Sequence, residues 1–213
     1  MTDELERRLA APSPARPLDL DGLRERLARA AGDAGLLDVA LGTVDSPLGT
    51  LTVMVTPAGL LRLSYPGEGI DAQLQEVADL VSPRILPAPE RTDAVRRQLD
   101  DYFERRRRSF DVPIDWRLVR GFAGNVLRAT ARIPFGTVSS YREVAGRAGS
   151  PNAYRAAGNA LGSNPIPIVV PCHRVVHAGG GLGGYTGGLE RKQYLLRLEG
   201  FLDAGTERAA RPS

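Results

Sequence analysis

The segment of residues 39–65 most constrains how this chain can fold, because its apolar side chains alternate around two turn signals. Alternation with a period of two is typical of β-strands with one buried face, and clusters of proline and glycine end such strands. The signals SPLG at residues 46–49 and PAG at residues 57–59 predict three short strands of an antiparallel meander. Helices are predicted after it, at about residues 70–81 and 91–107.

A single cysteine, Cys172, limits how the fold can be stabilised. One thiol excludes an intramolecular disulfide and a cysteine-rich zinc site. No apolar run approaches the roughly 20 residues that a bilayer span requires, and the charged N-terminus carries no readable secretory signal. We therefore expect a soluble, cytoplasmic protein without a membrane partner, in which Cys172 either fills the core or reacts.

The N-terminal residues form a predicted extension, in which Leu20, Leu23, Leu27 and Ala30 recur at helical spacing. We expect this amphipathic helix to pack against the next domain. The predicted parts of the chain are the helical extension (1–38), an N-terminal domain (39–111), a C-terminal domain (115–202) and a tail (203–213).

The C-terminal half contains a predicted helix-turn-helix. Helical periodicity covers residues 122–132, 140–147 and 152–161, and a glycine-containing turn at residues 148–151 joins the last two helices. This arrangement is typical of DNA-binding modules, although many helical proteins contain the same corner. The predicted fold class is α+β: a small strand-rich domain with an antiparallel sheet and helices, followed by a mainly helical, winged-helix-like domain.

Charge is distributed unevenly along the chain. Residues 1–114 carry 15 arginines against 19 acidic residues, a net charge of −4, whereas residues 115–213 carry 13 basic against 6 acidic residues, a net charge of +7. A one-sided positive field favours a phosphate-bearing partner, but basic side chains scattered over a solvated surface give the same count. The four arginines at residues 105–108 are interpreted as a solvated helix end.

The chemically informative segment is NPIPIVVPCHRVV, residues 164–176. Its prolines and β-branched residues predict a rigid, extended backbone that aims the Cys172 side chain. A thiol attacks carbon as a thiolate, which requires a base or a positive dipole nearby. His173 is adjacent, but neighbours on a strand point to opposite faces. His173 therefore serves only if the chain turns there or a water bridges the two groups.

Glu199 lies near the apolar face of a helix predicted over residues 189–200, where a carboxylate needs a partner. A hydrogen bond to an imidazole would satisfy the carboxylate and orient the ring. Spacing alone leaves two other interpretations open, a core cysteine and a helix-end charge.

The motif PCHRV at residues 171–175, with NPIPI at residues 164–168 and GYTGG at residues 184–188, resembles the O6-alkylguanine-DNA alkyltransferases, or methylated-DNA–protein-cysteine methyltransferases. The resemblance is strong over residues 115–202 and fair over residues 40–114. It implies DNA repair by stoichiometric, irreversible transfer of the alkyl group from O6-alkylguanine, and less efficiently from O4-alkylthymine, in duplex DNA to a cysteine after nucleotide flipping. The activity would be that of a single-turnover methylated-DNA–[protein]-cysteine S-methyltransferase without a cofactor.

The resemblance also implies catalytic roles. Cys172 would be the nucleophile and methyl acceptor, His173 the base acting through a water, and Glu199 the residue that orients the imidazole. Tyr141 would contact the DNA phosphate and donate a proton to the departing guanine. Asn164 would belong to the loop that ties the helix-turn-helix to the active-site strand.

Binding roles follow from the same resemblance. An alkyl group on O6 is inaccessible inside a duplex, so the nucleotide must be flipped out. Arg155 would fill the vacated place in the stack, while Ala156 and Gly158 let their helix approach the minor groove, whose degenerate pattern suits a protein that finds damage in any sequence. The residues implied to line the guanine pocket are Val175, through its carbonyl, and Pro167, Tyr185 and Thr186.

The chain departs from the family pattern at a few positions. Thr186 stands where many relatives have serine, and Leu127 where an aromatic residue is common. Some relatives hold zinc in the N-terminal domain, but this chain has no cysteine there and both histidines, His173 and His177, lie in the C-terminal half. We therefore predict no structural metal.

Two other functions are compatible with a fold of this kind. Alkyltransferase-like proteins bind the lesion without transfer but lack the cysteine, and adaptive-response regulators carry an additional zinc-binding activator domain. Both are disfavoured by this sequence. A monomer is expected, with cooperative binding along DNA, the range of alkyl groups and the role of the extension left open.

Overall fold

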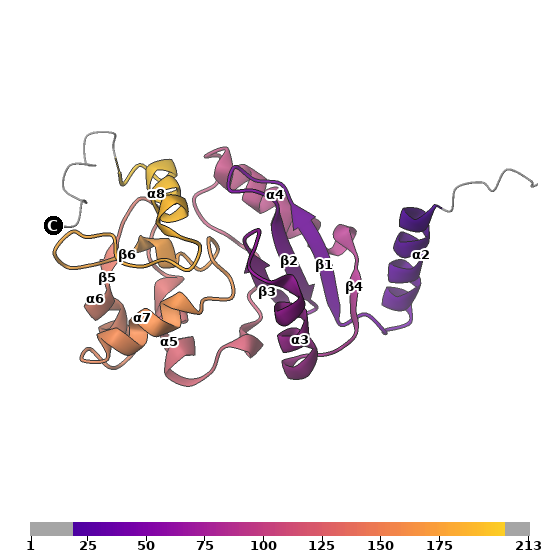
Figure 1. The fold of residues 1–213 in the computed structure, drawn as a ribbon, viewed down its shortest axis with the longest axis horizontal. Coiled ribbons are helices and arrows are strands. Elements are labelled where there is room, and N and C mark those ends of the chain that lie inside the picture. Colours follow the sequence, from indigo (N-terminus) through magenta and orange to yellow (C-terminus); the bar gives the residue numbers. More distant parts are fainter. Residues whose placement is uncertain (1–18, 203–213) are drawn as a thin grey trace, which may run out of the picture.

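The computed structural model describes residues 19–202, which form a sheet-containing half and a helical half (Figure 1). The fold class is α+β, as predicted. Residues 1–18 of the predicted extension and residues 203–213, the predicted tail, lie outside the described residues. Within the described part of the chain, no helix combines the length and the apolar character needed to cross a membrane.

The sheet has the strand order β3-β2-β1-β4. Strands β1 (Val39–Val44), β2 (Leu51–Thr56) and β3 (Gly59–Ser64) pair antiparallel, which confirms the predicted meander. The short β4 (Ile85–Pro87) was not predicted, and it pairs parallel to β1, so the sheet is mixed rather than antiparallel. Three residues ending in proline carry too little periodicity to be recognised as a strand.

Two helices cover opposite faces of this sheet. The alternation along β2 places Val53 and Met54 on different faces. Helix α4 (Pro89–Phe103) packs on the face of Val53, and helix α3 (Ile70–Leu80) packs on the face of Met54 through Val77. The core under α4 continues into the helical half, whereas the core under α3 is a separate cluster.

Helix α4 ends earlier than predicted. Arg105 adopts a left-handed φ of 59°, which an α-helix cannot accommodate, so the helix ends at Phe103. The arginines at residues 105–108 therefore follow the helix instead of forming its last turn. Within that run, Arg107 pairs with Asp111, and the Arg108 guanidinium lies over the Phe135 ring.

Helix α2 (Leu20–Asp33) confirms the predicted helix in the extension but packs through a different face. Ala28 and Ala31 are buried in a small cluster beside β4, whereas Leu20 and Leu27 are 56% and 59% exposed. The smaller alanine side chains let the helix approach the sheet closely. The leucine spacing thus marked the wrong face as buried.

The helical half carries a helix-turn-helix and the residues singled out as reactive (Figure 1). A backbone hydrogen bond of 2.9 Å from Leu63 to the Pro165 carbonyl joins β3 to the loop before Cys172. The elements of this half are η1 (Trp116–Leu118), α5 (Gly121–Thr130), β5 (Ser139–Ser140), α6 (Tyr141–Arg147), α7 (Tyr154–Gly162), η2 (Cys172–Arg174), β6 (Val175–Val176) and α8 (Leu189–Leu198).

Two short strands connect the helix-turn-helix to the cysteine segment. Strand β5 pairs in parallel with β6, with Ser139 opposite Val175 and Ser140 opposite Val176. Ser140 also caps α6, because its hydroxyl accepts a hydrogen bond from the Glu143 amide while the Glu143 carboxylate accepts one from the Ser140 amide. The start of α6 and the end of η2 are therefore held together.

Candidate active site

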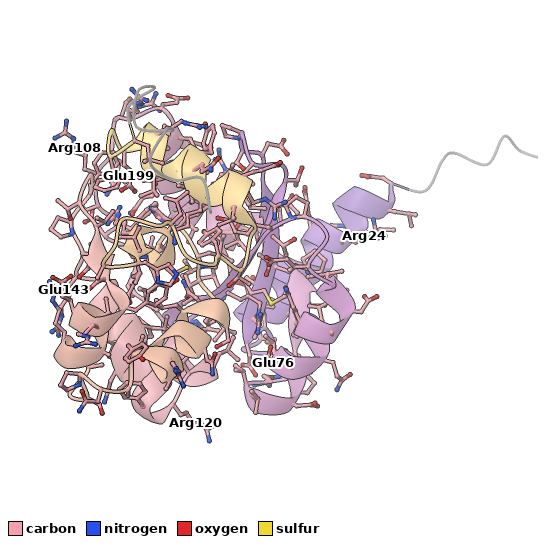
Figure 2. The ribbon with its side chains drawn as sticks, turned by 60° about the vertical axis from the view of Figure 1, so that its left-hand side comes forward. Arg24, Glu76, Arg108, Arg120, Glu143 and Glu199 are labelled. Atoms are coloured by element: carbon pink, nitrogen blue, oxygen red, sulfur yellow. The ribbon has the colours of Figure 1, made fainter. Side chains whose placement is uncertain are left out.

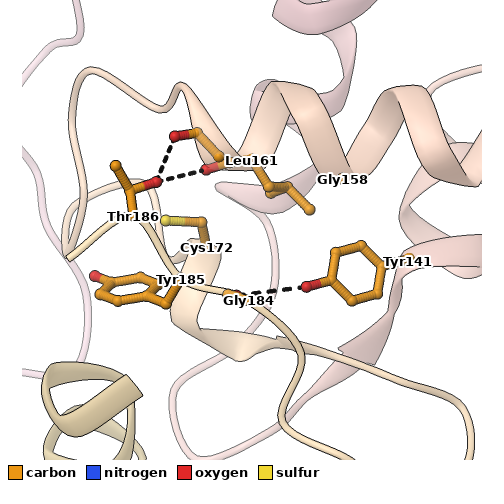
Figure 3. A pocket seen from close by; sticks show the side chains of 8 residues that line it. Tyr141, Gly158, Leu161, Cys172, Gly184, Tyr185 and Thr186 are labelled. Carbon is orange, nitrogen blue, oxygen red and sulfur yellow. Dashed lines mark hydrogen bonds between the residues drawn. The ribbon is translucent and has the colours of Figure 1, made fainter. Parts of the chain in front are cut away.

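Cys172 lies in a pocket of about 260 Å³ between the helix-turn-helix and the loop before α8 (Figure 3). The cysteine is only 4% exposed, so the pocket is the route by which a ligand reaches it. The lining residues are Tyr141, Gly158, Leu161, Gly162, Cys172, Gly184, Tyr185 and Thr186.

The backbone before Cys172 is not the extended strand that the sequence predicted. Residues 166–170 form turns, with Val170 donating a 2.9 Å hydrogen bond to the Ile166 carbonyl, and Ile168 adopts a φ of 70°. Cys172 then begins the 3₁₀ turn η2. Because the chain turns at this point, the side chains of Cys172 and His173 need not point to opposite sides, as they would on a strand.

Asn164 holds this turn and contacts the thiol. Its side-chain carbonyl accepts a hydrogen bond from the Ile166 amide. Its amide donates to the Val170 carbonyl at 2.8 Å and to Cys172 Sγ at 3.1 Å. A side-chain donor aimed at the sulfur stabilises a thiolate more than a thiol.

His173, the residue after the cysteine, forms a buried pair with Glu199. His173 Nε2 lies 2.9 Å from Glu199 Oε1, and both side chains are fully buried. Burial lowers the pKa of His173, which favours the neutral imidazole. The other ring nitrogen, Nδ1, has no hydrogen-bond partner among the described residues. A neutral ring held at one nitrogen has the other available to accept a proton.

Glu199 is held by more partners than the sequence indicated. Arg174 binds both of its carboxylate oxygens at 2.8 Å, and the Tyr102 hydroxyl donates to Oε1 at 2.7 Å. Burial favours the protonated acid, but the hydrogen bonds from His173 and Arg174 hold the pKa of Glu199 at about 2. The carboxylate is therefore charged at neutral pH. Glu199 lies just beyond the end of α8, on the helical side of the molecule (Figure 2).

Burial dominates the electrostatics of the thiol. It raises the pKa of Cys172 to about 11, against the opposing effects of the Asn164 hydrogen bond and the Lys192 charge. At neutral pH the cysteine is consequently a thiol, and its reaction requires that a base remove the proton.

Lys192, the only lysine in the chain, was not recognised as a site residue from the sequence. Its side chain is fully buried, and its ammonium group donates to the carbonyls of Val175, Leu182 and Gly184. Burial lowers the pKa of Lys192 to about 8. The lysine thus connects the backbone after η2 to the loop of residues 182–187, called the pocket loop because part of it lines the pocket.

The pocket walls come from three segments. Tyr141 begins α6, and its hydroxyl lies 3.5 Å from the Gly184 carbonyl. On α7, a Cβ at Gly158 would lie 3.8 Å from the Tyr141 ring, so glycine keeps this side open. Thr186 turns its hydroxyl to the Gly162 carbonyl at the end of α7 (Figure 3).

Other residues singled out from the sequence lie around this pocket but do not line it. Pro167 and Val175 are buried, and the Val175 carbonyl accepts a 2.6 Å hydrogen bond from Lys192. Arg155 and Ala156 are exposed in the first turn of α7, one turn before Gly158. Of the residues singled out from the sequence, the structure brings five into the pocket lining: Tyr141, Gly158, Cys172, Tyr185 and Thr186. Outside the lining, Asn164 bonds to the Cys172 sulfur, and His173 pairs with Glu199. The remaining four, Arg155, Ala156, Pro167 and Val175, also lie outside the lining.

Tyr65, Tyr102 and Arg174 contact these residues without having been assigned a role from the sequence. Lys192, likewise unassigned, bonds to the neighbouring backbone carbonyls. Tyr65 and Tyr102 belong to the sheet-containing half, so their contacts are long-range. Arg174 follows His173 directly, and its pairing with a carboxylate 25 residues away could have been inferred only from the need to neutralise a buried charge. Across residues 19–202, no group of three or more histidine, cysteine or acidic side chains could hold a metal ion.

Comparisons with known protein families cover both halves. Residues 39–116 match the model described as 6-O-methylguanine DNA methyltransferase, ribonuclease-like domain. Residues 121–201 match the model described as 6-O-methylguanine DNA methyltransferase, DNA binding domain.

Several named proteins are similar to this chain over most of their own length. The Methylated-DNA--protein-cysteine methyltransferase of Mycobacterium tuberculosis is 40% identical over 159 residues, covering 74% of this chain and 90% of the relative. The human protein of the same name is 37% identical over 165 residues, covering 74% of this chain and 79% of the human protein. The crystal structure of Mycobacterium tuberculosis OGT in complex with DNA aligns with a TM-score of 0.65 at 37% identity, covering 81% of this chain and 95% of that one.

Proposed function

The chain belongs to the 6-O-methylguanine DNA methyltransferase family, and on that premise we propose that it removes the alkyl group from O6-alkylguanine in duplex DNA by transferring it to Cys172. Its family is one of DNA-binding enzymes that repair DNA by alkyl transfer to a cysteine of the protein. The specific lesion, the acceptor residue and the way the base reaches the pocket are the parts that we propose. O4-alkylthymine is proposed as a poorer substrate.

One observation carries the proposal. The only cysteine of the chain lies in a pocket, with a donor on its sulfur, and the next residue is a histidine paired with a buried carboxylate. A cysteine that merely fills a core needs no pocket beside it and no oriented base. A nucleophilic cysteine needs both.

The proposed reaction begins with proton removal. His173 is neutral because burial lowers its pKa, and its Nδ1 has no partner among residues 19–202, so it can accept the thiol proton through a bridging water. The charged Glu199 carboxylate stabilises the imidazolium that results. Asn164 and Lys192 favour the thiolate.

Transfer then exchanges one bond for another. The Cys172 sulfur attacks the alkyl carbon, a carbon–sulfur bond forms, and the bond between that carbon and O6 breaks. The electron pair of the broken bond remains with the guanine, and the Tyr141 hydroxyl supplies a proton to the departing base. The His173 imidazolium gives up the former thiol proton to water, and Tyr141 regains a proton from water, so the net change moves the thiol proton to the guanine. The product is a thioether, which the site has no means to cleave, so one molecule of protein repairs one lesion.

Nucleotide flipping is the proposed route into the pocket. Extruding a base costs a few kcal/mol, which a side chain inserted into the stack can partly offset. Arg155 suits this role because it is exposed in the first turn of α7, the helix that also supplies Gly158 to the pocket. We propose that α7 enters the minor groove, with Ala156 and Gly158 permitting close approach. Tyr185, Thr186, Pro167 and the Val175 carbonyl are proposed to recognise the guanine.

Intact-mass spectrometry tests the proposed reaction. After incubation with a duplex that carries one O6-methylguanine, the protein should gain the mass of one CH₂ unit, once only and on Cys172. A duplex with guanine at the same position should produce no gain. The Cys172→Ala variant should bind the methylated duplex and remain unmodified. An unmodified wild-type protein that binds the duplex would instead identify a lesion-binding protein without transferase activity.

A further inference from the structure

Tyr65, which lies immediately after β3 in the sheet-containing half, reaches the wall of the cysteine pocket. Its hydroxyl lies 2.7 Å from the hydroxyl of Tyr185, and the two rings meet edge to face at 6.3 Å. The ring of Tyr65 also presses against the pocket loop, because a Cβ at Gly187 would lie 2.6 Å from it. Tyr65 is 3% exposed. A side chain far away in the sequence is therefore fixed against a residue that lines the pocket.

The environment of the two phenols indicates which of them donates. The Arg191 guanidinium lies 4.5 Å from the centre of the Tyr65 ring, and Tyr185 has no such cation over its ring among the described residues. A nearby positive charge makes a phenol more acidic and hence a better donor. Burial raises the pKa of both tyrosines, but Arg191 counteracts this for Tyr65. The hydrogen bond could run in either direction, and this difference in acidity favours Tyr65 as the donor and Tyr185 as the acceptor.

The direction of this hydrogen bond determines where the Tyr185 proton can go. A phenol has one proton to donate. When Tyr65 donates to the Tyr185 oxygen, the Tyr185 proton is free to turn toward another acceptor. Cys172 lies across the same pocket, above the Tyr185 ring (Figure 3).

We propose that Tyr65 is a positioning residue for the alkyl transfer: by donating a hydrogen bond to the Tyr185 hydroxyl, it fixes that side chain and directs its proton to the Cys172 sulfur. This inference rests on the proposed function, because it assigns Tyr65 a part in activating the acceptor thiol. It makes the sheet-containing half a contributor to the reactive site.

Other charged and titratable groups around the thiol also influence the reactivity of Cys172. Lys192 of α8 lowers the pKa of Cys172 by its charge, and Tyr185 lowers it by hydrogen bonding, although burial is the larger influence and raises it. Tyr141 of α6 and the adjacent His173 also face the site. None of these groups needs to move when the Tyr65 hydroxyl alone is removed.

Tyr65→Phe is the informative variant, because it removes the hydroxyl and keeps the ring that contacts Gly187 and Arg191. The probe is iodoacetamide, whose addition to the only cysteine is read by intact mass without DNA. We expect the rate of alkylation between pH 7 and 10 to fall about three- to tenfold at each pH, the effect of one lost hydrogen bond. Tyr185→Phe should act similarly, and Tyr65→Phe/Tyr185→Phe should be no slower than Tyr185→Phe alone.

Tyr194→Phe is the matched control, since Tyr194 is half-buried on α8 and does not line the pocket, and its rate should equal that of the wild type. In single-turnover transfer from O6-methylguanine duplex, Tyr65→Phe should lower the first-order rate constant and leave the half-saturating DNA concentration unchanged. A Tyr65→Phe rate profile that overlays the wild type, or effects of the two substitutions that multiply, would overturn the inference. Since iodoacetamide needs no DNA, this result is distinguishable from a wild type that fails to accept a methyl group.

Discussion

The Tyr102 hydroxyl donates a 2.7 Å hydrogen bond to the same Glu199 oxygen that lies 2.9 Å from His173 Nε2. Tyr102 belongs to α4, which covers the sheet, whereas Glu199 follows the last helix of the other half. The two halves therefore share a buried polar network in addition to their apolar contacts. Removing one member of this network should lower the stability of both halves.

Tyr102→Phe should lower the free energy of unfolding by about 1.5–3 kcal/mol, because it removes a buried hydrogen bond to a charged group. Urea denaturation at pH 7 measures the change. Tyr154→Phe, which alters a 40% exposed tyrosine, should stay within about 0.5 kcal/mol of the wild type. Equal stabilities of the two variants would show that the Tyr102 hydroxyl contributes nothing.

Glu199 should make the fold sensitive to acid. Its pKa is held at about 2 in the folded protein against an ordinary value of 4.5, so the native state binds its proton less readily than the unfolded chain. The stabilisation, about 3 kcal/mol, is complete above pH 4.5 and is lost as the pH falls toward 2. Denaturation at a series of pH values should show this slope in the wild type.

Glu199→Gln isolates this contribution from that of other carboxylates. In this variant, the free energy of unfolding should fall less steeply between pH 4.5 and pH 2 than in the wild type. The variant should also be less stable at pH 7 by about 3–5 kcal/mol, because the buried Arg174 loses the carboxylate that pairs with it. Glu190→Gln, at an exposed position of α8, should retain the full slope. Parallel slopes for wild type and Glu199→Gln would contradict the assignment.

Arg155→Ala should slow transfer from duplex DNA by about 5- to 30-fold, a part of the few kcal/mol that flipping costs. The reaction with the free base O6-methylguanine, which needs no flipping, should keep its wild-type rate. Arg97→Ala removes an exposed arginine of α4 and controls for net charge. If both substrates slow equally, Arg155 acts on the pocket and not on the duplex.

Lys192 should be protected from acylation in the folded protein, because its ammonium group is fully buried among three carbonyls. With acetyl-N-hydroxysuccinimide at pH 8, an added Nα-acetyl-lysine reference should be modified rapidly and Lys192 only as the protein opens. Peptide mass mapping in water and in urea measures the extent of Lys192 modification. Modification of native Lys192 as fast as of the reference would refute the buried position.

Neighbouring positions of α2 should respond in opposite ways. Leu27→Gln changes a 59% exposed side chain and should alter the free energy of unfolding by less than about 0.5 kcal/mol. Ala28→Gln introduces a larger, polar side chain at a 1% exposed position and should destabilise the packing of α2 by about 1–3 kcal/mol. Thermal unfolding followed by circular dichroism compares the two. If Leu27→Gln were more destabilising than Ala28→Gln, the leucine face of α2 would be the buried one.

Local patterns predicted the elements whose signals are contained in a few residues. The meander of β1, β2 and β3 follows from alternation and turn residues, and the helices follow from apolar periodicity. The short β4 and the end of α4 at Phe103 were missed because they depend on pairing with β1 and on the backbone conformation of Arg105. Two prolines near Cys172 suggested extension, whereas the structure uses the same rigidity in a turn.

The site was predictable to the extent that its residues form motifs. Cys172, His173 and Asn164 lie in one short segment, and Glu199 was singled out because a carboxylate on an apolar face requires a partner. The contacts of Tyr65, Tyr102 and Lys192 were not predictable, since nothing in the local sequence says that a tyrosine of the sheet-containing half approaches the pocket. Only the packing of the halves brings these groups together.

The pairing of β5 with β6 has a consequence for how the protein handles DNA. Ser140 caps α6 and pairs with Val176, only a few residues from Cys172, so the helix that precedes the turn and the nucleophile are parts of one stiff unit. On the proposed mode of binding, in which the helix-turn-helix contacts the duplex, no long linker separates that contact from the sulfur. The distance from the DNA axis to the sulfur would then be set when the protein folds, and the proposed flipping would deform the DNA rather than the protein.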